Sequence, residues 1–90
     1  MNQIIISKKA QKQLQKLPIH IIRKLQTWSA QVEMIGIREV RKISGYHDEP
    51  LQGNRSDQRS IRLSKAYRAF YIEYADQIII EVIEVNNHEY

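Results

Sequence analysis

The sequence predicts an α+β fold, in which an N-terminal strand and a helical hairpin pack on a small, largely antiparallel sheet. Three observations predict it: apolar residues recur at helical spacing in the first third, a loop-like segment follows, and runs of β-branched and aromatic residues fill the last third. Ninety residues leave little room for a second domain, so we expect a single domain over residues 1–90.

The chain begins with a short run of β-branched residues, which predicts a strand over residues 3–7. Ser7 at its end suits the N-cap of a helix that starts with two lysines. The apolar residues of this helix fall on one side and its lysines and glutamines face outward: Ala10, Leu14 and Leu17.

Pro18 interrupts this helix and suits the first turn of a second one, which Gly36 is placed to end. Its apolar residues stand at helical spacing: Ile21, Ile22, Leu25, Trp28 and Val32. We expect Trp28 to anchor the core and His20 to have no functional role.

The pattern changes after Gly36. Apolar and charged residues are interspersed over residues 37–44, which fits either a short helical end or a strand. Residues 45–58 have the composition of a loop. Two strands over 59–64 and 67–74 then join tightly through Lys65–Ala66. A turn at Asp76–Gln77 leads to a third strand over 78–85.

The net charge of +4 is distributed unevenly. Residues 1–37 carry six basic side chains against one acidic, residues 38–68 carry eight against four, and residues 69–90 carry none against five. The positive field therefore belongs to the first two thirds of the chain. Its natural partner is a polyanion such as RNA, DNA or an acidic protein, although a solvated surface without a specific partner has the same charge.

Strand alternation predicts that arginines gather on one face of the sheet. Arg62 faces away from the apolar residues on either side of it, and Arg68 does the same on the next strand. Arg55 and Arg59, on the preceding loop, would edge the same surface. Guanidinium groups that converge bind phosphate well, because each offers planar paired donors. Alternatively, these arginines pair with acidic residues of neighbouring strands: Glu73, Glu81 and Glu84.

Several classes of site are excluded by composition. The chain has no cysteine, so it has no disulfide, zinc thiolate or catalytic thiol, and it has no metal-spaced cluster, phosphate-cradling glycine loop or nucleophilic serine triad. We expect no metal and no cofactor. The apolar run at the start is too short for a signal peptide or a membrane span, so we expect a cytoplasmic protein that does not bind membranes.

The segments "GYHDEPLQGNRSDQRSIRLSKAYRAFYIEY" and "EVIEVNNHEY" resemble the RelE/ParE superfamily of bacterial type II toxins, and most closely the HigB/RelE-type mRNA interferases. The resemblance consists of a Pro-Leu-x-Gly-x-Arg loop, the "SIRL" strand, a Tyr-Arg strand and a C-terminal His-x-Tyr. It is specific over the last half of the chain, and the first half agrees in pattern. It implies the RelE-like, microbial-RNase-like fold.

The resemblance also implies site residues. Arg68 matches the strand arginine that contacts the scissile phosphate, Arg55 matches the basic residue of the loop, and Tyr90 matches the C-terminal tyrosine. His88 and His47 are candidates for proton transfer, because histidine titrates near neutral pH. Further basic residues are expected to bind RNA: Arg59, Arg62, Lys65, Lys8, Lys9, Lys12 and Lys16.

The activity implied is ribosome-dependent cleavage of mRNA through attack by the 2′-hydroxyl, without metal. The implied partners are mRNA, the ribosome and a cognate antitoxin resembling the helix-turn-helix protein HigA, with operator DNA contacted only through the antitoxin. Two alternatives stay open: a ParE-like inhibitor of DNA gyrase, and a degenerate toxin that only binds its antitoxin. The second follows from Glu49 and Gln52, which stand where relatives carry histidine and lysine.

Overall fold

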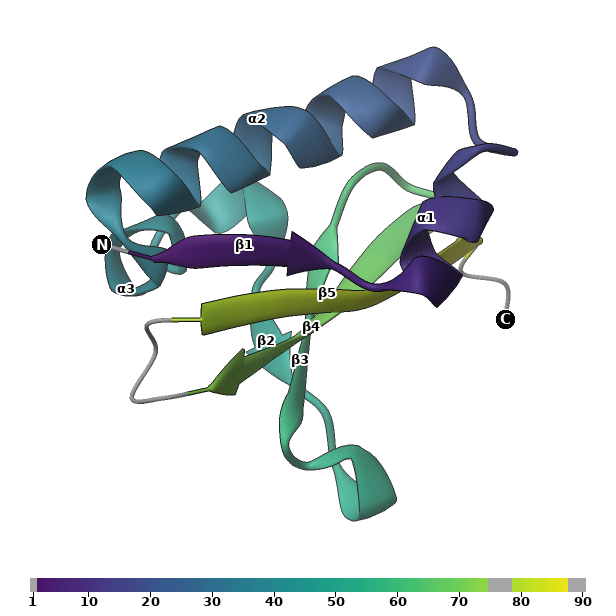
Figure 1. The fold of residues 1–90 in the computed structure, drawn as a ribbon. Coiled ribbons are helices and arrows are strands. Elements are labelled where there is room, and N and C mark those ends of the chain that lie inside the picture. The colour runs from purple at the N-terminus through teal and green to yellow at the C-terminus, as the bar shows by residue number, and fades with distance from the viewer. Residues whose placement is uncertain (1, 75–78, 88–90) are drawn as a thin grey trace.

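The computed structural model of the protein describes residues 2–74 and 79–87. Within them the chain forms one mixed sheet with helices on one side, which confirms the predicted α+β class (Figure 1). The strand order is β1-β5-β4-β3-β2, with β1 parallel to β5 and every other pair antiparallel. The strands are β1 (Gln3–Ile6), β2 (Glu49–Pro50), β3 (Gln58–Arg62), β4 (Tyr67–Tyr74) and β5 (Ile79–Asn87).

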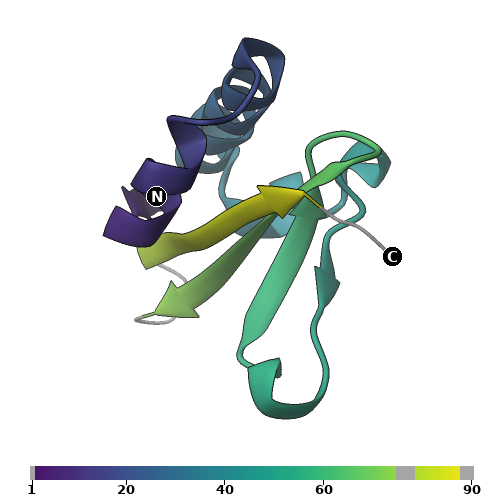
Figure 2. The ribbon, with the colours of Figure 1, turned by 90° about the vertical axis from the view of Figure 1, so that its right-hand side faces the viewer.

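The two predicted helices are α1 (Lys8–Leu14) and α2 (Ile19–Ile35), which lie on the same side of the sheet (Figure 2). Ser7 caps α1 as expected, since its hydroxyl accepts a hydrogen bond from the backbone N–H of Ala10 at 3.1 Å. The same hydroxyl donates to the carbonyl of Ile83 at 3.1 Å, which ties the start of α1 to the central strand β5.

The segment after α2 is helical. Gly36 ends α2 at a φ of +89°, and α3 (Ile37–Val40) follows it directly, so the first of the two alternatives for residues 37–44 is correct. The backbone N–H of Ile37 donates to Oδ1 of Asn2 at 2.7 Å, which fixes this corner beside the start of β1. The predicted loop contains two short 3₁₀ helices, η1 (Ser44–Tyr46) and η2 (Gly53–Arg55), in addition to β2.

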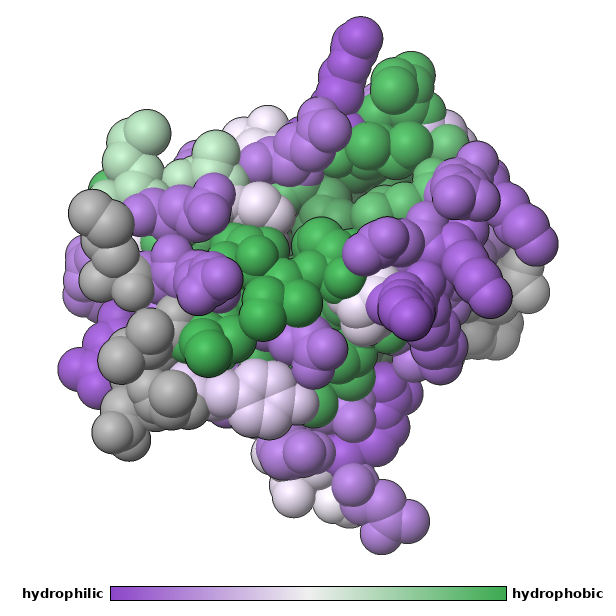
Figure 3. Space-filling view, viewed as in Figure 1, coloured by the Kyte–Doolittle hydropathy of each residue, from purple (hydrophilic) through white to green (hydrophobic). Residues whose placement is uncertain are grey.

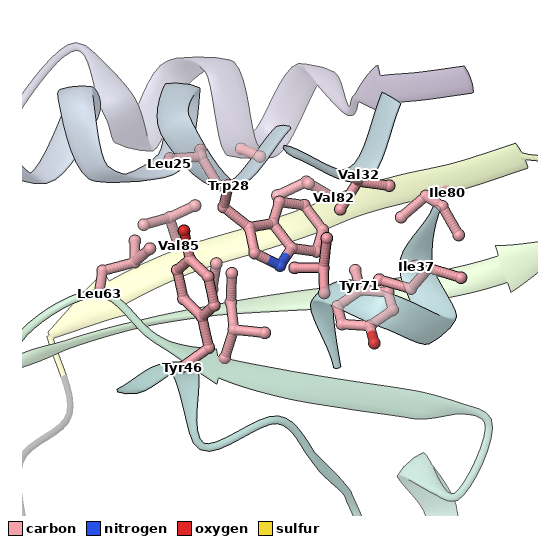
Figure 4. Packing of buried hydrophobic residues seen from close by; sticks show 14 of the residues in the cluster. Leu25, Trp28, Val32, Ile37, Tyr46, Leu63, Tyr71, Ile80, Val82 and Val85 are labelled. Carbon is pink, nitrogen blue, oxygen red and sulfur yellow. The ribbon is translucent and has the colours of Figure 1, made fainter. Parts of the chain in front are cut away.

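The hydrophobic core lies between α2 and the sheet (Figure 4). Trp28 is fully buried and its ring packs against that of Tyr71 at a centroid distance of 5.3 Å, so its predicted role as a core anchor is confirmed. The core residues of the strands alternate as the pleat requires, except at Val85: Ile61, Ala69, Tyr71, Ile80 and Val82.

One irregularity in the sheet positions the site. Phe70 pairs with Glu84, but the next residue, Tyr71, pairs with Val82, so β5 has an extra residue at this point. The extra residue lets Val82 and Val85 both face the core, although they are three positions apart. It leaves Glu84 on the face that carries Phe70.

The predicted turn at Asp76–Gln77 lies outside the described residues. No helix in the described part of the chain is both long enough and apolar enough to span a membrane.

Candidate nucleic-acid interface

The sheet face opposite α2 carries the arginines that alternation assigned to it. Arg62 on β3 stands directly opposite Arg68 on β4, and Phe70 stands between Ser60 on β3 and Glu84 on β5. We call this surface, formed by five sheet residues together with Arg55 from η2, the arginine face. Its sheet residues are Ser60, Arg62, Arg68, Phe70 and Glu84.

Arg68 is held in place by two neighbours. Its Nη1 donates to the hydroxyl of Ser60 at 2.9 Å, and its Nη2 lies 3.6 Å from Oε1 of Glu49 on β2. The Arg68 side chain is 17% exposed and that of Glu49 is 61% exposed, so the contact opens to solvent. Arg62 has no ion pair with any described residue, and like charges directly opposite on neighbouring strands repel. The pair Arg62–Arg68 is therefore suited to an anion that lies between the two guanidinium groups.

Arg55 lies over the middle of the arginine face. Its Nε donates to Oε1 of Gln58 at 2.8 Å, and its Nη2 lies 3.4 Å from Oε1 of Glu84. Its guanidinium carbon is 4.7 Å from the centre of the Phe70 ring, within the range of a cation–π contact. Arg55 and Arg68 thus approach the same sheet face from different segments of the chain.

Among the described residues, the alternative in which these arginines pair with Glu73, Glu81 or Glu84 is correct for Arg55 alone. Glu84 pairs with Arg55 and also with Lys9 of α1, at 3.3 Å. Glu73 pairs with Arg41 instead, and Glu81 accepts a hydrogen bond from the Tyr74 hydroxyl. The arginine face therefore combines cations with carboxylates that partly neutralise them.

Arg59 is the exception, because the prediction that it edges the arginine face is wrong. Arg59 lies in β3 opposite Tyr71, so its side chain is on the α2 side of the sheet. There its Nε donates to Oδ1 of Asp48 at 2.6 Å. The signal was available, since Arg59 and the core residue Ile61 are two positions apart and share a face in a strand. The predicted strand over 59–64 already begins at Arg59, but the prediction groups this residue with the loop and does not apply its parity with Ile61.

The carboxylate that Arg59 contacts is almost completely buried. The Asp48 side chain is 1% exposed, and its Oδ2 accepts a hydrogen bond from the Tyr71 hydroxyl at 2.6 Å. Burial, followed by the nearby charge of Asp48, raises the pKa of Tyr71, so this hydroxyl stays protonated and donates. Arg41 joins the cluster through the Tyr71 hydroxyl, at 3.3 Å. These contacts connect the loop before β2 to the core.

Of the other predicted RNA-binding residues, Lys9 contacts the arginine face and the remaining lysines are exposed on the surface. The lysines of the α1 segment are exposed, and hydrophilic side chains gather over α1 in Figure 3: Lys8, Lys9, Lys12 and Lys16. Lys9 reaches the arginine face through Glu84. Lys65 is exposed in the turn between β3 and β4.

The histidines are dispersed. His47 is exposed in the loop before β2, where it has a φ of +45°, and His20 is exposed on α2. The predictions for His88 and Tyr90 fall on residues that lie outside the described part of the chain. No group of three side chains of the types that bind metals is placed to hold an ion within residues 2–74 and 79–87.

Glu49 is a site residue that the sequence treated only as a departure from a pattern. Its carboxylate lies beside Arg68, so this position supplies a polar group that differs from the one in the pattern. Only the pairing of β2 with β3, which sets Glu49 opposite Ser60, brings it to the arginine face.

No protein-family model matches the chain, and the comparison with curated proteins finds no match. Solved structures with the same fold include a chain of the toxin–antitoxin complex RelBE2 from Mycobacterium tuberculosis, with a TM-score of 0.71 and 16% identity, covering 97% of this chain and 98% of that one. A chain of the YoeB–YefM complex from Staphylococcus aureus has a TM-score of 0.71 and 20% identity, covering 99% of both chains.

A chain of the archaeal RelE–RelB complex from Pyrococcus horikoshii has a TM-score of 0.70 and 20% identity, covering 96% of this chain and 93% of that one. The structural neighbours are thus RelE- and YoeB-type proteins of type II toxin–antitoxin systems over nearly the whole chain. The fold implied by the resemblance in the sequence is confirmed: this chain has the fold of the RelE-like toxins.

Proposed function

We propose that this protein is the toxin of a type II toxin–antitoxin system and an endoribonuclease that cleaves mRNA on the ribosome. Two independent findings support the proposal. The fold is that of RelE- and YoeB-type proteins, and arginines from separate segments approach one face of the sheet. The observation that carries it furthest is the cross-strand pair Arg62–Arg68, because like charges directly opposite on neighbouring strands repel, and a bound anion would relieve that repulsion.

The reaction is a transesterification within the RNA. The 2′-oxygen of one nucleotide forms a bond to the adjacent phosphorus while the bond from phosphorus to the 5′-oxygen breaks. A base takes the proton of the 2′-hydroxyl, and an acid gives a proton to the leaving 5′-oxygen. The products are a cyclic phosphate and a free 5′-hydroxyl. Arg68, with Arg55 and Arg62, would stabilise the negative charge that builds up on the phosphorane oxygens.

The proton-transfer groups belong to the same proposal. Glu49 is a candidate base, since its carboxylate is 61% exposed and adjoins Arg68, where the phosphate would bind. His88 and His47 remain candidates for the acid, and Tyr90 for orienting the substrate or stacking on a base. The carboxylate of Glu49 supplies a candidate acid–base group at one of the two positions on which the degenerate-toxin alternative rests. The other is Gln52, where a cationic group is missing.

The partners follow from the same assignment. The exposed lysines of α1 would bind phosphates of ribosomal RNA, which positions the enzyme without reading sequence. A cognate antitoxin, similar to the helix-turn-helix protein HigA, would neutralise the toxin by covering the arginine face. Contact with operator DNA would occur only through that antitoxin, and the complex would act in the cytoplasm.

The test is to induce Arg68→Ala in growing bacteria and map cleavage of mRNA by primer extension. We expect cleavage to fall about 100- to 1000-fold, as when one donor to a developing oxyanion is removed, and growth arrest to be relieved. Arg23→Ala is the matched control, because this arginine is exposed on α2, away from the arginine face, and should leave cleavage unchanged. Thermal unfolding of both variants verifies that each is folded.

Undiminished cleavage by Arg68→Ala would remove Arg68 from the site. Arrest of growth with intact mRNA and blocked DNA supercoiling would instead identify an inhibitor of gyrase. Binding of the antitoxin without any growth arrest would identify a degenerate toxin. Each outcome has a separate readout, so one set of strains distinguishes the three functions.

A further inference from the structure

Phe70 is unusual for an aromatic residue on an uncovered sheet face, since it is only 8% exposed. Its ring lies on the side opposite the core, between Ser60 of β3 and Glu84 of β5. It is hidden by the guanidinium group of Arg55, at 4.7 Å from the ring centre. The guanidinium group of Arg55 therefore helps to shield the ring from solvent.

This cover is weakly held. The Arg55 side chain is 43% exposed, and its polar contacts are one hydrogen bond to Gln58 and one ion pair with Glu84. Ion pairs that open to solvent contribute little to stability, because water competes for both partners. A phosphate can take both donors of a guanidinium group at once, so it competes well for Arg55.

The position of the ring fits one nucleotide. Phe70 and Arg68 are two residues apart on β4, so their side chains leave the sheet on the same face and adjoin. A phosphate bound between Arg62 and Arg68 brings the base of the same nucleotide toward the ring. An aromatic ring in a sheet is a general stacking platform for unpaired bases.

We propose that Phe70 is a stacking platform for a base of single-stranded RNA, which Arg55 covers in the free protein and uncovers when it turns to phosphate. This inference rests on the proposed function and adds to it a contact with a base. Glu84 is the positioning residue of the cover, because it holds Arg55 in its resting place.

The experiment measures binding to a single-stranded RNA in which every 2′-hydroxyl is methylated, so that cleavage cannot occur. The same sugar–phosphate chain without bases is the comparison. We expect the unmodified protein to bind the RNA about 5- to 150-fold more tightly than the abasic chain, the effect of stacking one base. Phe70→Leu should abolish this preference and Phe70→Tyr should retain it. The unmodified protein and both variants should bind the abasic chain with equal affinity.

Tyr74→Leu is the matched control, because Tyr74 is 44% exposed on the same face of β4 but at its far end. It should leave the preference unchanged. Glu84→Gln tests the cover: release of Arg55 should tighten binding to both chains by up to about fivefold, the range of one exposed ion pair. No tightening of binding would overturn the covering role.

A preference for bases that survives in Phe70→Leu would overturn the platform, while binding of RNA itself would still support the proposed function. Failure to bind either chain would overturn the proposed function together with the platform. If Phe70→Leu does not fold, 2-aminopurine placed at each position of the RNA gives the answer with the unmodified protein. Stacking of 2-aminopurine on the Phe70 ring quenches the fluorescence of 2-aminopurine. The absence of quenching at every position would overturn the proposal that Phe70 stacks on a base.

Discussion

At the scale of single residues, the cluster around Asp48 is a structural counterpart of the arginine face. Its buried carboxylate accepts from Arg59 and Tyr71, each at 2.6 Å, and these partners come from two central strands. Asp48 directly precedes β2, whose first residue is Glu49. The cluster therefore fixes the backbone from which Glu49 reaches Arg68, and it explains why Arg59 lies away from the arginine face.

Removing the Asp48 carboxylate leaves the mostly buried Arg59 without its acidic partner, which is more costly than losing the pair as a whole. We expect Asp48→Ala to lower the free energy of unfolding by about 3 kcal/mol. This is the lower end of the range for buried pairs, because Arg59 and Arg41 remain about a quarter exposed, at 24% and 25%. Urea unfolding measures this change in the free energy of unfolding. Glu33→Gln, exposed on α2, is the control, and a loss below about 1 kcal/mol for Asp48→Ala would contradict the assignment.

At the scale of elements, the junction of α2 and α3 depends on one backbone conformation. Gly36 adopts φ +89° and ψ 153°, a region that residues with a Cβ rarely enter. The sharp change of direction lets Ile37 and Val40 of α3 enter the core directly after α2 ends. It also brings the N–H of Ile37 to Asn2, so the start of the chain is fixed to the same corner.

Gly36→Ala should lower the free energy of unfolding by about 1–3 kcal/mol through backbone strain. Space is not the cause, because a Cβ at this position would meet Oδ1 of Asn2 at 3.5 Å, an ordinary contact. Gly45→Ala is the matched control: its Cβ would meet nothing within 4 Å, and its backbone lies outside the left-handed region. Equal melting temperatures for the two variants would exclude strain at Gly36.

At the scale of the whole molecule, the fold mixes charges that the sequence keeps apart. The acidic last third contributes β5, which the sheet order places between β1 and β4, so Glu84 lies beside Arg55 and Lys9. The arginine face is therefore partly neutralised in the free protein. The exposed lysines in and just after α1 add further positive charge: Lys8, Lys9, Lys12 and Lys16.

The double variant Lys12→Gln/Lys16→Gln should weaken binding to RNA for all sequences alike, because binding to phosphates carries no sequence information. For a single strand, the slope of log affinity against log salt should fall by about 0.7 for each phosphate that the variant leaves without a cationic partner. The variant Arg23→Gln/Lys42→Gln removes the same charge from α2 and from the segment after α3. Identical slopes for the two double variants would show that only net charge matters, and not the lysines of α1.

Much of the fold was predictable because its causes are local. The spacing of Leu25, Trp28 and Val32 specifies a buried helix face. Ser7 marks the start of α1 through a side-chain hydrogen bond, and Gly36 marks the end of α2 through its positive φ. Alternation likewise placed Arg62 and Arg68 on the uncovered side of the sheet. For the site, strand parity accounts for Arg62 and Arg68, but not for Arg55, which lies in η2, or for Glu49.

What the sequence by itself determined is the type of most elements and the face on which their side chains lie, because both follow from periodicities of two and 3.6 residues. Tertiary structure alone decided which groups meet. The parallel pairing of β1 with β5, the contact of Glu49 with Arg68 and the cover of Arg55 over Phe70 all depend on how distant segments are brought together in the sheet. Register joins residues distant in the chain, and the core that stabilises one register over another exists only when the whole sheet has formed.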